Sequence, residues 1–163
     1  MKEKIRSFCV DHDRLLPGIY VSRIDGDVIT YDLRMRRPNS GEYLSDLELH
    51  SLEHLLATFM RAGSAGERVI YVGPMGCRTG FYLLMRGSAD QNLENLSALK
   101  DALRAITVYD GPMPGAHRRE CGNYRCLSVA AARREAERYL TVLSSLGDDP
   151  SFAYDGETEN GGL

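Results

Sequence analysis

The chain has 163 residues, of which 43% are hydrophobic and 26% charged, and its formal net charge at pH 7 is −3. This length predicts one domain with its own core, and the composition excludes a collagen-like repeat and wholesale disorder. No apolar run reaches the roughly 18–20 residues that cross a bilayer, and the N-terminus lacks the apolar stretch of a secretory signal. We therefore expect a cytoplasmic protein.

The charge is unevenly distributed along the chain. Five of the 23 acidic residues and none of the 20 basic residues lie in residues 148–163, which leaves residues 1–147 with a net charge of +2. A nearly neutral body lacks the basic surface that displaces counterions from phosphates, so sequence-independent nucleic-acid binding is excluded. We assign 1–147 to the folded domain and expect 148–163 to be a flexible acidic tail, because it has little apolar surface to bury.

Two short strands and a helix are predicted in the first part of the chain. Residues 18–22 and 27–33 have the composition of strands, and the Asp-Gly pair at 25–26 predicts a hairpin between them. Residues 45–48 read Ser-Asp-Leu-Glu. This is a capping box, in which the serine and glutamate side chains bind free backbone N–H groups at a helix start. A helix is therefore expected from there to about Ala62.

Two more strands and two more helices follow. Residues 67–72 and 80–85 are short apolar runs separated by a turn rich in glycine and proline, which predicts a second strand pair. A second capping box at 88–91 begins a helix whose apolar residues recur at helical spacing as far as Ile106, and a last helix is predicted over 127–146. Together the elements predict an α+β single domain in which a mainly antiparallel sheet packs against three to four helices.

Two histidines and a glutamate lie close together inside the first predicted helix. His50, Glu53 and His54 form the pattern HxxEH, in which imidazoles at positions i and i+4 lie on one side of a helix and can bind one cation. The alternative is a pair of solvent-exposed helical histidines. Four neighbouring leucines disfavour that alternative, because they predict a buried helix whose polar groups need partners. They are Leu49, Leu52, Leu55 and Leu56.

A metal site of this kind needs a third protein ligand. Tetrahedral catalytic sites usually combine three protein ligands with one open position. Cys121 is attractive, because Gly122 follows it and a nearby helix start favours a thiolate. On the residues alone, His117 and Cys126 remain alternatives, as do His12 and several carboxylates.

Cys77 is the second unusual feature. It lies in the turn Gly-Pro-Met-Gly-Cys-Arg-Thr between two predicted strands, next to Arg78. A cysteine exposed at a strand end beside a cation is typical of a reactive thiolate. The alternative is a small residue that fills a tight turn.

Five blocks of sequence occur together in a fixed order. They are Ser7-Phe8 with Asp11-His12, Tyr31–Arg34 before Pro38-Asn39, His50–Leu55, Pro74–Tyr82 and Glu120–Gly122. Taken together, these blocks resemble S-ribosylhomocysteine lyase, the LuxS family. HxxEHL followed by PMGCxTGxY is the most specific part of the resemblance.

The resemblance implies a metal-dependent lyase. It implies that His50, His54 and Cys121 hold a divalent metal, natively Fe²⁺, with Zn²⁺ or Co²⁺ as workable substitutes. The family cleaves S-ribosylhomocysteine to homocysteine and 4,5-dihydroxy-2,3-pentanedione, the precursor of the quorum-sensing signal autoinducer-2, by successive carbonyl migration and β-elimination. Cys77 and Glu53 match the family residues that move protons in this reaction.

The same resemblance implies substrate-binding positions and a partner. Ser7, His12 and Arg34 match residues that bind substrate, and arginine suits a substrate carboxylate because of its forked donors. The family is a homodimer whose sites lie at the subunit interface and draw on both chains. We therefore expect a second copy of this chain as the partner.

The sequence departs from the family pattern at two places. Residues 71–73 read Tyr-Val-Gly where the family usually has Asp-Ile-Ser, so an acidic group that commonly contacts substrate is missing. Residues 35–36 read Met-Arg where Phe-Cys is usual. Because the metal and Cys77 positions match, the lyase reaction remains the prediction. The alternatives are an HxxEH metallopeptidase and a metal-binding module without turnover.

Overall fold

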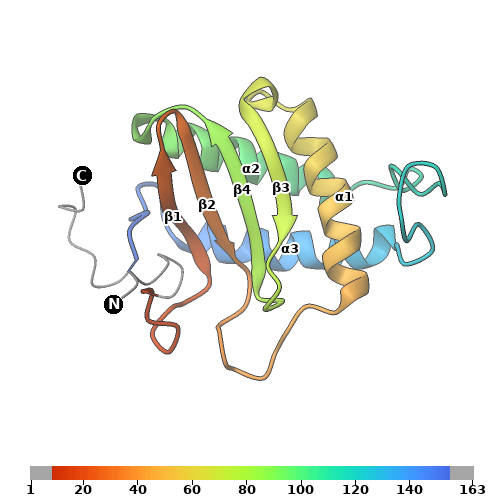
Figure 1. Ribbon diagram of the computed structural model, residues 1–163, viewed down its shortest axis with the longest axis horizontal. Coiled ribbons are helices and arrows are strands. Elements are labelled where there is room, and N and C mark those ends of the chain that lie inside the picture. The colour runs from red at the N-terminus through yellow and green to blue at the C-terminus, as the bar shows by residue number, and fades with distance from the viewer. Residues whose placement is uncertain (1–8, 155–163) are drawn as a thin grey trace, which may run out of the picture.

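Four strands form one antiparallel sheet in the computed structural model, which describes residues 9–154 (Figure 1). In spatial order the strands are β1 (Gly18–Asp25), β2 (Val28–Arg34), β4 (Gly80–Arg86) and β3 (Val69–Pro74). Each strand is antiparallel to its hydrogen-bonded neighbour. Hairpins join β1 to β2 and β3 to β4, and the chain passes from β2 to β3 through a helix.

Three helices pack against this sheet. They are α1 (Asp46–Ala62), α2 (Asn92–Thr107) and α3 (Val129–Ser145). In Figure 1, α2 and α3 lie behind the sheet and α1 lies beside β3. The α+β single-domain prediction is confirmed. None of the helices within residues 9–154 is long and apolar enough to cross a membrane.

Both predicted capping boxes are present. The Ser45 hydroxyl accepts the Glu48 backbone N–H, and the Glu48 carboxylate accepts the Ser45 N–H at 2.8 Å, which sets the start of α1. Ser88 and Gln91 make the same reciprocal pair at a short 3₁₀ turn, η3 (Ala89–Gln91), which leads into α2.

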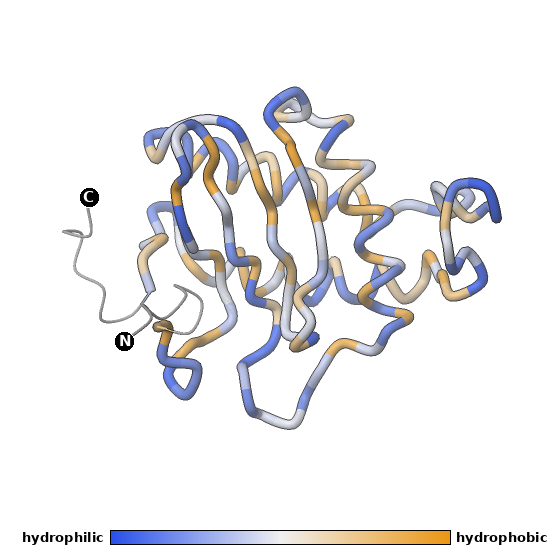
Figure 2. The backbone as a smooth tube through the Cα atoms, viewed as in Figure 1, coloured by the Kyte–Doolittle hydropathy of each residue, from blue (hydrophilic) through white to orange (hydrophobic). Residues whose placement is uncertain are grey.

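The core lies between the sheet and the three helices. Figure 2 shows apolar residues along the strands and helices, while the turns at the ends of the molecule are largely polar. Along β2, Ile29, Tyr31 and Leu33 are completely buried in this core. Because side chains alternate along a strand, Asp32 and Arg34 lie on the opposite face, yet both are buried as well. Other parts of the chain must therefore cover and pair these two charges.

The third strand begins later than the sequence predicts. The predicted strand 67–72 is observed at Val69–Pro74, because residues Gly66–Arg68 form a 3₁₀ turn, η2. Gly66 lies so close to the end of α1 that an added Cβ would be 2.0 Å from the Arg61 carbonyl oxygen. The close turn after α1 therefore takes up Gly66–Arg68, and the strand starts at Val69.

Candidate active site

α1 holds two imidazoles and a carboxylate beside the loop that joins α2 to α3 (108–128). His50 and His54 lie one helical turn apart, with ring centroids 4.8 Å apart. Both side chains are partly exposed, as is that of Glu53. The four predicted leucines are buried on the other side of the helix. The core therefore fixes the helix, and the helix fixes both rings.

Cys121 completes a three-residue cluster. Its Sγ atom lies 3.2 Å from Nε2 of His50, and the ligand atoms of His50, His54 and Cys121 all lie within 4.8 Å of one another. The loop holds the cysteine in place, because its backbone N–H donates to the His117 carbonyl at 3.0 Å. Among the third ligands left open on the residues alone, the structure brings Cys121 to the histidines. Within residues 9–154, His117 and Cys126 do not join this cluster.

Two backbone carbonyls set the tautomer of both histidines. Nδ1 of His50 lies 2.8 Å from the Cys126 carbonyl oxygen, and Nδ1 of His54 lies 2.7 Å from the Pro114 carbonyl oxygen. Because a carbonyl can only accept a hydrogen bond, each Nδ1 carries the proton and each Nε2 offers a lone pair. This is the arrangement in which imidazoles bind metals.

The cluster has the donors and spacing of a transition-metal site. With metal–nitrogen bonds of about 2.1 Å and a metal–sulfur bond of about 2.3 Å, the ligand atoms of a tetrahedral site lie about 3.6 Å apart. The 3.2 Å between Cys121 Sγ and His50 Nε2 and the 4.8 Å limit for the cluster bracket this value. Two imidazoles and one thiolate suit Fe²⁺, Co²⁺ and Zn²⁺. The residues present therefore fit a divalent metal.

Gly115 holds the loop against His54 and provides a test of this geometry. Its φ is +69°, and an added Cβ would lie 3.0 Å from Nδ1 of His54. We expect Gly115→Ala to push the ring away from the Pro114 carbonyl and to weaken metal binding roughly 10- to 100-fold, measured by competition with a chelator. Gly122→Ala, next to Cys121 but with open space around the added Cβ, should keep the parent affinity. Equal affinities in both variants would contradict the assigned geometry.

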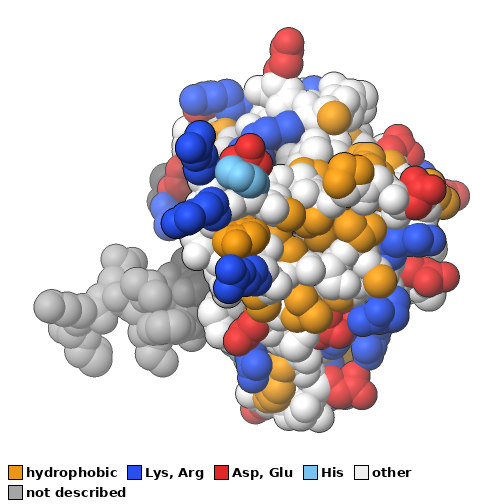
Figure 3. All heavy atoms as spheres, turned by 90° about the vertical axis from the view of Figure 1, so that its right-hand side faces the viewer, with side chains coloured by type: hydrophobic (Ala, Val, Ile, Leu, Met, Phe, Trp, Pro, Cys, Tyr) orange, Lys and Arg blue, Asp and Glu red, His pale blue; other side chains and the backbone are white. Residues whose placement is uncertain are grey.

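A hollow of about 250 Å³ opens beside the metal cluster. It is lined by Glu53, His54, Ala57, Thr58, Pro114 and Gly115. Glu53 and the candidate metal ligand His54 therefore line the same open space. Figure 3 views the molecule from this end and shows hydrophobic side chains across the middle of the face, with basic side chains on both sides of them.

Cys77 lies in the turn between β3 and β4, at the lower end of the sheet in Figure 1. The residue is exposed, and its Sγ lies 3.0 Å from Oγ1 of Thr79 and 4.0 Å from Nη1 of Arg34. Nη1 of Arg34 also donates to Oγ1 of Thr79 at 2.7 Å. A guanidinium and a hydroxyl are groups that can hold the negative charge of a thiolate. Cys77 is exposed, as the sequence predicts, and the cation in contact with its thiol is that of Arg34; the reactivity of this thiol stays a prediction.

Asp32 holds this arginine in place. Asp32 and Arg34 are 1% and 3% exposed, and Arg34 donates through Nε to Oδ1 at 3.0 Å and through Nη2 to Oδ2. Burial acts to lower the pKa of Arg34, but the hydrogen bond and the charge of Asp32 raise the pKa above its ordinary value. Arg34 therefore stays positively charged. Its Nε and Nη2 atoms are bound to Asp32, which leaves Nη1 to contact Thr79 and Cys77.

Comparison with known proteins decides the family. The model of the family described as S-Ribosylhomocysteinase (LuxS) matches residues 5–148. The chain belongs to the LuxS family. Curated LuxS relatives named S-ribosylhomocysteine lyase match over most of their length. The protein of Clostridium acetobutylicum is 41% identical over 152 residues, which cover 90% of this chain and 96% of that protein. The protein of Porphyromonas gingivalis is 41% identical over 157 residues, covering 93% and 98%.

The substrate-binding residues predicted for this LuxS chain lie in different surroundings. Ser7 lies outside the described residues. His12 is partly buried in the turn before β1, with Nδ1 2.9 Å from the Val10 carbonyl oxygen. Arg34 is buried on β2, forked onto Asp32. The role of these three residues in binding substrate stays a prediction.

Both departures from the LuxS pattern have a local structural counterpart. Tyr71 is 51% exposed, and its ring lies over Gly73, where an added Cβ would be 2.3 Å from the ring. This position of the tyrosine ring therefore requires glycine two residues later. Arg36 is buried and pairs with Glu135 of α3 at 2.5 Å.

Sequence reasoning missed four groups of the site. The carbonyls of Pro114 and Cys126 carry no signal of residue type, so only the folded loop reveals them. Of the two side chains, Asp32 and Thr79, Asp32 did leave a signal in the sequence. Asp32 stands two positions from Arg34 along one strand, and residues at that spacing share a face of the sheet. A buried arginine beside a carboxylate at i−2 is a predictable pair.

Proposed function

We propose that the chain is a metal-dependent carbon–sulfur lyase that cleaves S-ribosylhomocysteine to homocysteine and 4,5-dihydroxy-2,3-pentanedione, the precursor of autoinducer-2. The observation that carries this proposal is the cluster of His50, His54 and Cys121 in a chain of the LuxS family. The accessible Cys77 beside Arg34 supports the same reaction. The named activity of the curated relatives, which match this chain over most of its length, supports the substrate.

The metal is assigned to Nε2 of His50, Nε2 of His54 and Sγ of Cys121. We propose Fe²⁺ as the native ion, with Zn²⁺ or Co²⁺ as substitutes, since this donor set accepts all three. When bound, such an ion supplies Lewis-acid stabilisation of the negative charge that develops on a substrate oxygen. The carbonyls of Pro114 and Cys126 keep both histidines in the tautomer that binds it.

Two side chains are assigned to proton transfer. As the carbonyl group of the open-chain sugar moves from C1 to C3, each shift takes a proton from one carbon and returns one to its neighbour. Sγ of Cys77, beside Thr79 and Arg34, takes and returns these protons. Glu53 removes the C4 proton in the last step. The C4–C5 double bond then forms, and the C5–S bond breaks with its electron pair leaving on the homocysteine sulfur.

We also propose that the active form is a homodimer whose sites lie between the subunits. Figure 1 shows the β3–β4 turn that carries Cys77 at the lower end of the sheet, whereas the loop that carries Cys121 lies beyond α1 on the right. A second copy would bring the thiol of one chain to the metal cluster of the other. Exposed Ile70 and Tyr71 on the edge strand β3 offer apolar surface for such a contact.

Coexpression of two inactive variants tests this arrangement. Cys77→Ala removes the thiol and His50→Ala removes a metal ligand, so neither variant alone should release product. In a heterodimer with shared sites, one of the two sites contains both intact parts. We therefore expect a 1:1 mixture to regain about a quarter of the parent rate. A mixture as inactive as the separate variants would show that each site belongs to a single chain.

Thiol titration tests the proposed reaction. The protein is reconstituted anaerobically with metal and incubated with S-ribosylhomocysteine, and free thiol is measured over time. We expect thiol release. Peptide cleavage without thiol release would instead identify an HxxEH metallopeptidase, and metal binding with neither activity would identify a binding module. Either of these results would overturn the lyase proposal.

A further inference from the structure

The segment after α3 returns to the sheet and places Tyr154 on the face opposite the helices. The Phe152 carbonyl accepts the backbone N–H of Val21 on β1 at 2.7 Å. The Tyr154 ring stacks on Tyr20, with centroids 5.0 Å apart and planes 17° apart. Tyr154 is only 6% exposed. The segment around Phe152 and Tyr154 is thus packed against the sheet, in contact with β1.

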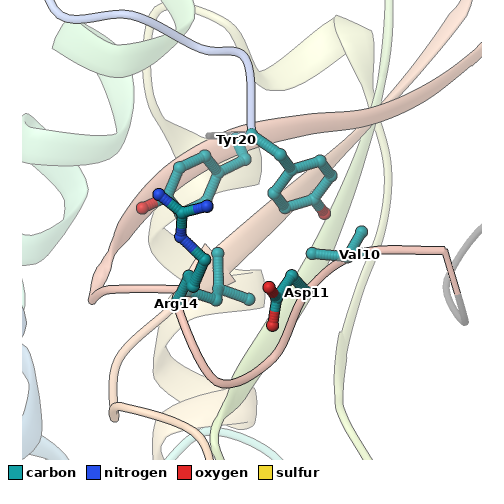
Figure 4. Close-up of a pocket in the computed structure, with 6 residues that line it drawn as sticks. Val10, Asp11, Arg14 and Tyr20 are labelled. Carbon is teal, nitrogen blue, oxygen red and sulfur yellow. The ribbon is translucent and has the colours of Figure 1, made fainter. Parts of the chain in front are cut away.

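The N-terminal turn packs against the same aromatic pair. Val10, Asp11 and Arg14 approach Tyr20 and line a small cavity there (Figure 4). Leu15 and Tyr154 complete the lining of this cavity. The phenol of Tyr154 is therefore enclosed between β1 and the N-terminal turn, and its position is fixed from both sides.

An unbroken series of contacts joins Tyr154 to Cys77. The Tyr154 hydroxyl donates to Oδ2 of Asp32 at 2.9 Å, and Asp32 accepts the forked donors of Arg34. Nη1 of Arg34 donates to Thr79 at 2.7 Å, and Oγ1 of Thr79 lies 3.0 Å from Sγ of Cys77. Tyr154 itself has no hydrogen bond to Cys77 among the described residues. Any effect on the thiol therefore passes through Asp32 and Arg34.

The phenol is a permanent donor in this network. Burial, with the neighbouring charge of Asp32, raises the pKa of Tyr154 well above its ordinary value, so the hydroxyl keeps its proton. It satisfies a lone pair of Oδ2 of Asp32, whose other hydrogen-bond partner within residues 9–154 is the Arg34 guanidinium. Without the Tyr154 hydroxyl, the Asp32 carboxylate is free to change its orientation. The Arg34 guanidinium, which donates two hydrogen bonds to this carboxylate, then moves with it.

We propose that Tyr154 is a positioning residue for Cys77, which acts by holding Asp32 so that Nη1 of Arg34 points toward Thr79 and the thiol. The inference rests on the proposed function only for the role of Cys77 in turnover. The effect on the thiol itself is measurable without substrate.

Alkylation of Cys77 by iodoacetamide tests the proposal. The zinc-loaded full chain is treated at pH 7, and the modification rate at Cys77 is followed by peptide mass spectrometry. Tyr154→Phe keeps the ring that stacks on Tyr20 and removes only the hydroxyl. We expect this variant to react about threefold more slowly than the parent, the size of effect that follows from losing one hydrogen bond. In thiol-release assays its kcat should fall by a similar factor.

Tyr31→Phe is the matched control. Tyr31 precedes Asp32 on the same strand but points into the core, where its buried hydroxyl binds Asn92 and Asn95. The Tyr31→Phe variant should lose about as much thermal stability as Tyr154→Phe, and its Cys77 should be alkylated at the parent rate. Equal alkylation rates in parent and Tyr154→Phe, or equal slowing in both variants, would overturn the proposal.

A double-mutant cycle tests whether the effect passes through Asp32. In an Asp32→Asn background, adding Tyr154→Phe should leave the alkylation rate unchanged, whereas a further threefold loss would overturn the proposal. Absence of thiol release in the parent would refute the proposed reaction instead. The alkylation rates would still decide the role of Tyr154.

Discussion

Replacing Cys77 by alanine should lower homocysteine release roughly 10²- to 10⁴-fold while leaving the metal bound. This is the range expected when a general acid–base group is removed. The metal should stay, because its three ligands come from α1 and the loop before α3, whereas the hydrogen bonds of Cys77 within residues 9–154 go to Arg34 and Thr79. Thiol titration and metal analysis of the same sample measure both effects.

Cys126→Ala is the matched control for this prediction. The variant keeps the backbone carbonyl that orients His50, so it should bind metal and release thiol at close to the parent rate. Unchanged release by Cys77→Ala would remove this residue from the mechanism. Loss of metal from Cys77→Ala would mean that the thiol and the metal cluster are not separate parts of the site.

Breaking the buried ion pair between Arg36 and Glu135 should lower the free energy of unfolding by about 3–5 kcal/mol. The two side chains are 5% and 7% exposed, and their charged atoms lie 2.5 Å apart. Glu135→Leu leaves the Arg36 guanidinium buried without its carboxylate, which is the costly outcome. Urea unfolding of parent and variant measures the difference. Because Arg36 follows Arg34 by two residues, this pair also holds the end of β2 that carries the thiol network.

Replacing both partners separates the charge effect from packing. Arg36→Met together with Glu135→Leu removes both charges and should recover most of the lost stability. Arg138→Ala breaks the exposed pair with Glu42, whose side chains are 54% and 69% exposed, and should change stability by less than about 1 kcal/mol. A single Glu135→Leu variant within 1 kcal/mol of the parent would contradict this account of the pair.

Local sequence signals predicted the elements of the fold well. The capping box at 45–48 set the start of α1, and the Asp-Gly pair at 25–26 identified the hairpin between β1 and β2. The start of β3 was misplaced, because the close approach of Gly66 to Arg61 depends on how α1 ends in space and leaves no local pattern.

The candidate site was predictable only where it is local in sequence. The spacing of His50 and His54 on one helix indicated two metal ligands. The choice of Cys121 over His117 and Cys126 needed either the family resemblance or the folded loop, because the three residues lie within nine positions of one another. The contact between Tyr154 and Asp32 joins residues 122 positions apart, and nothing in either neighbourhood predicts it.

Detection of both products from S-ribosylhomocysteine tests the proposed lyase reaction most directly. The metal-loaded protein is incubated anaerobically with the substrate, homocysteine is measured as free thiol, and the dicarbonyl product is trapped with an aromatic 1,2-diamine. We expect the two products in equal amounts from the loaded protein and neither from the metal-free protein. Thiol without dicarbonyl, or equal turnover after the metal is removed, would contradict a metal-dependent lyase.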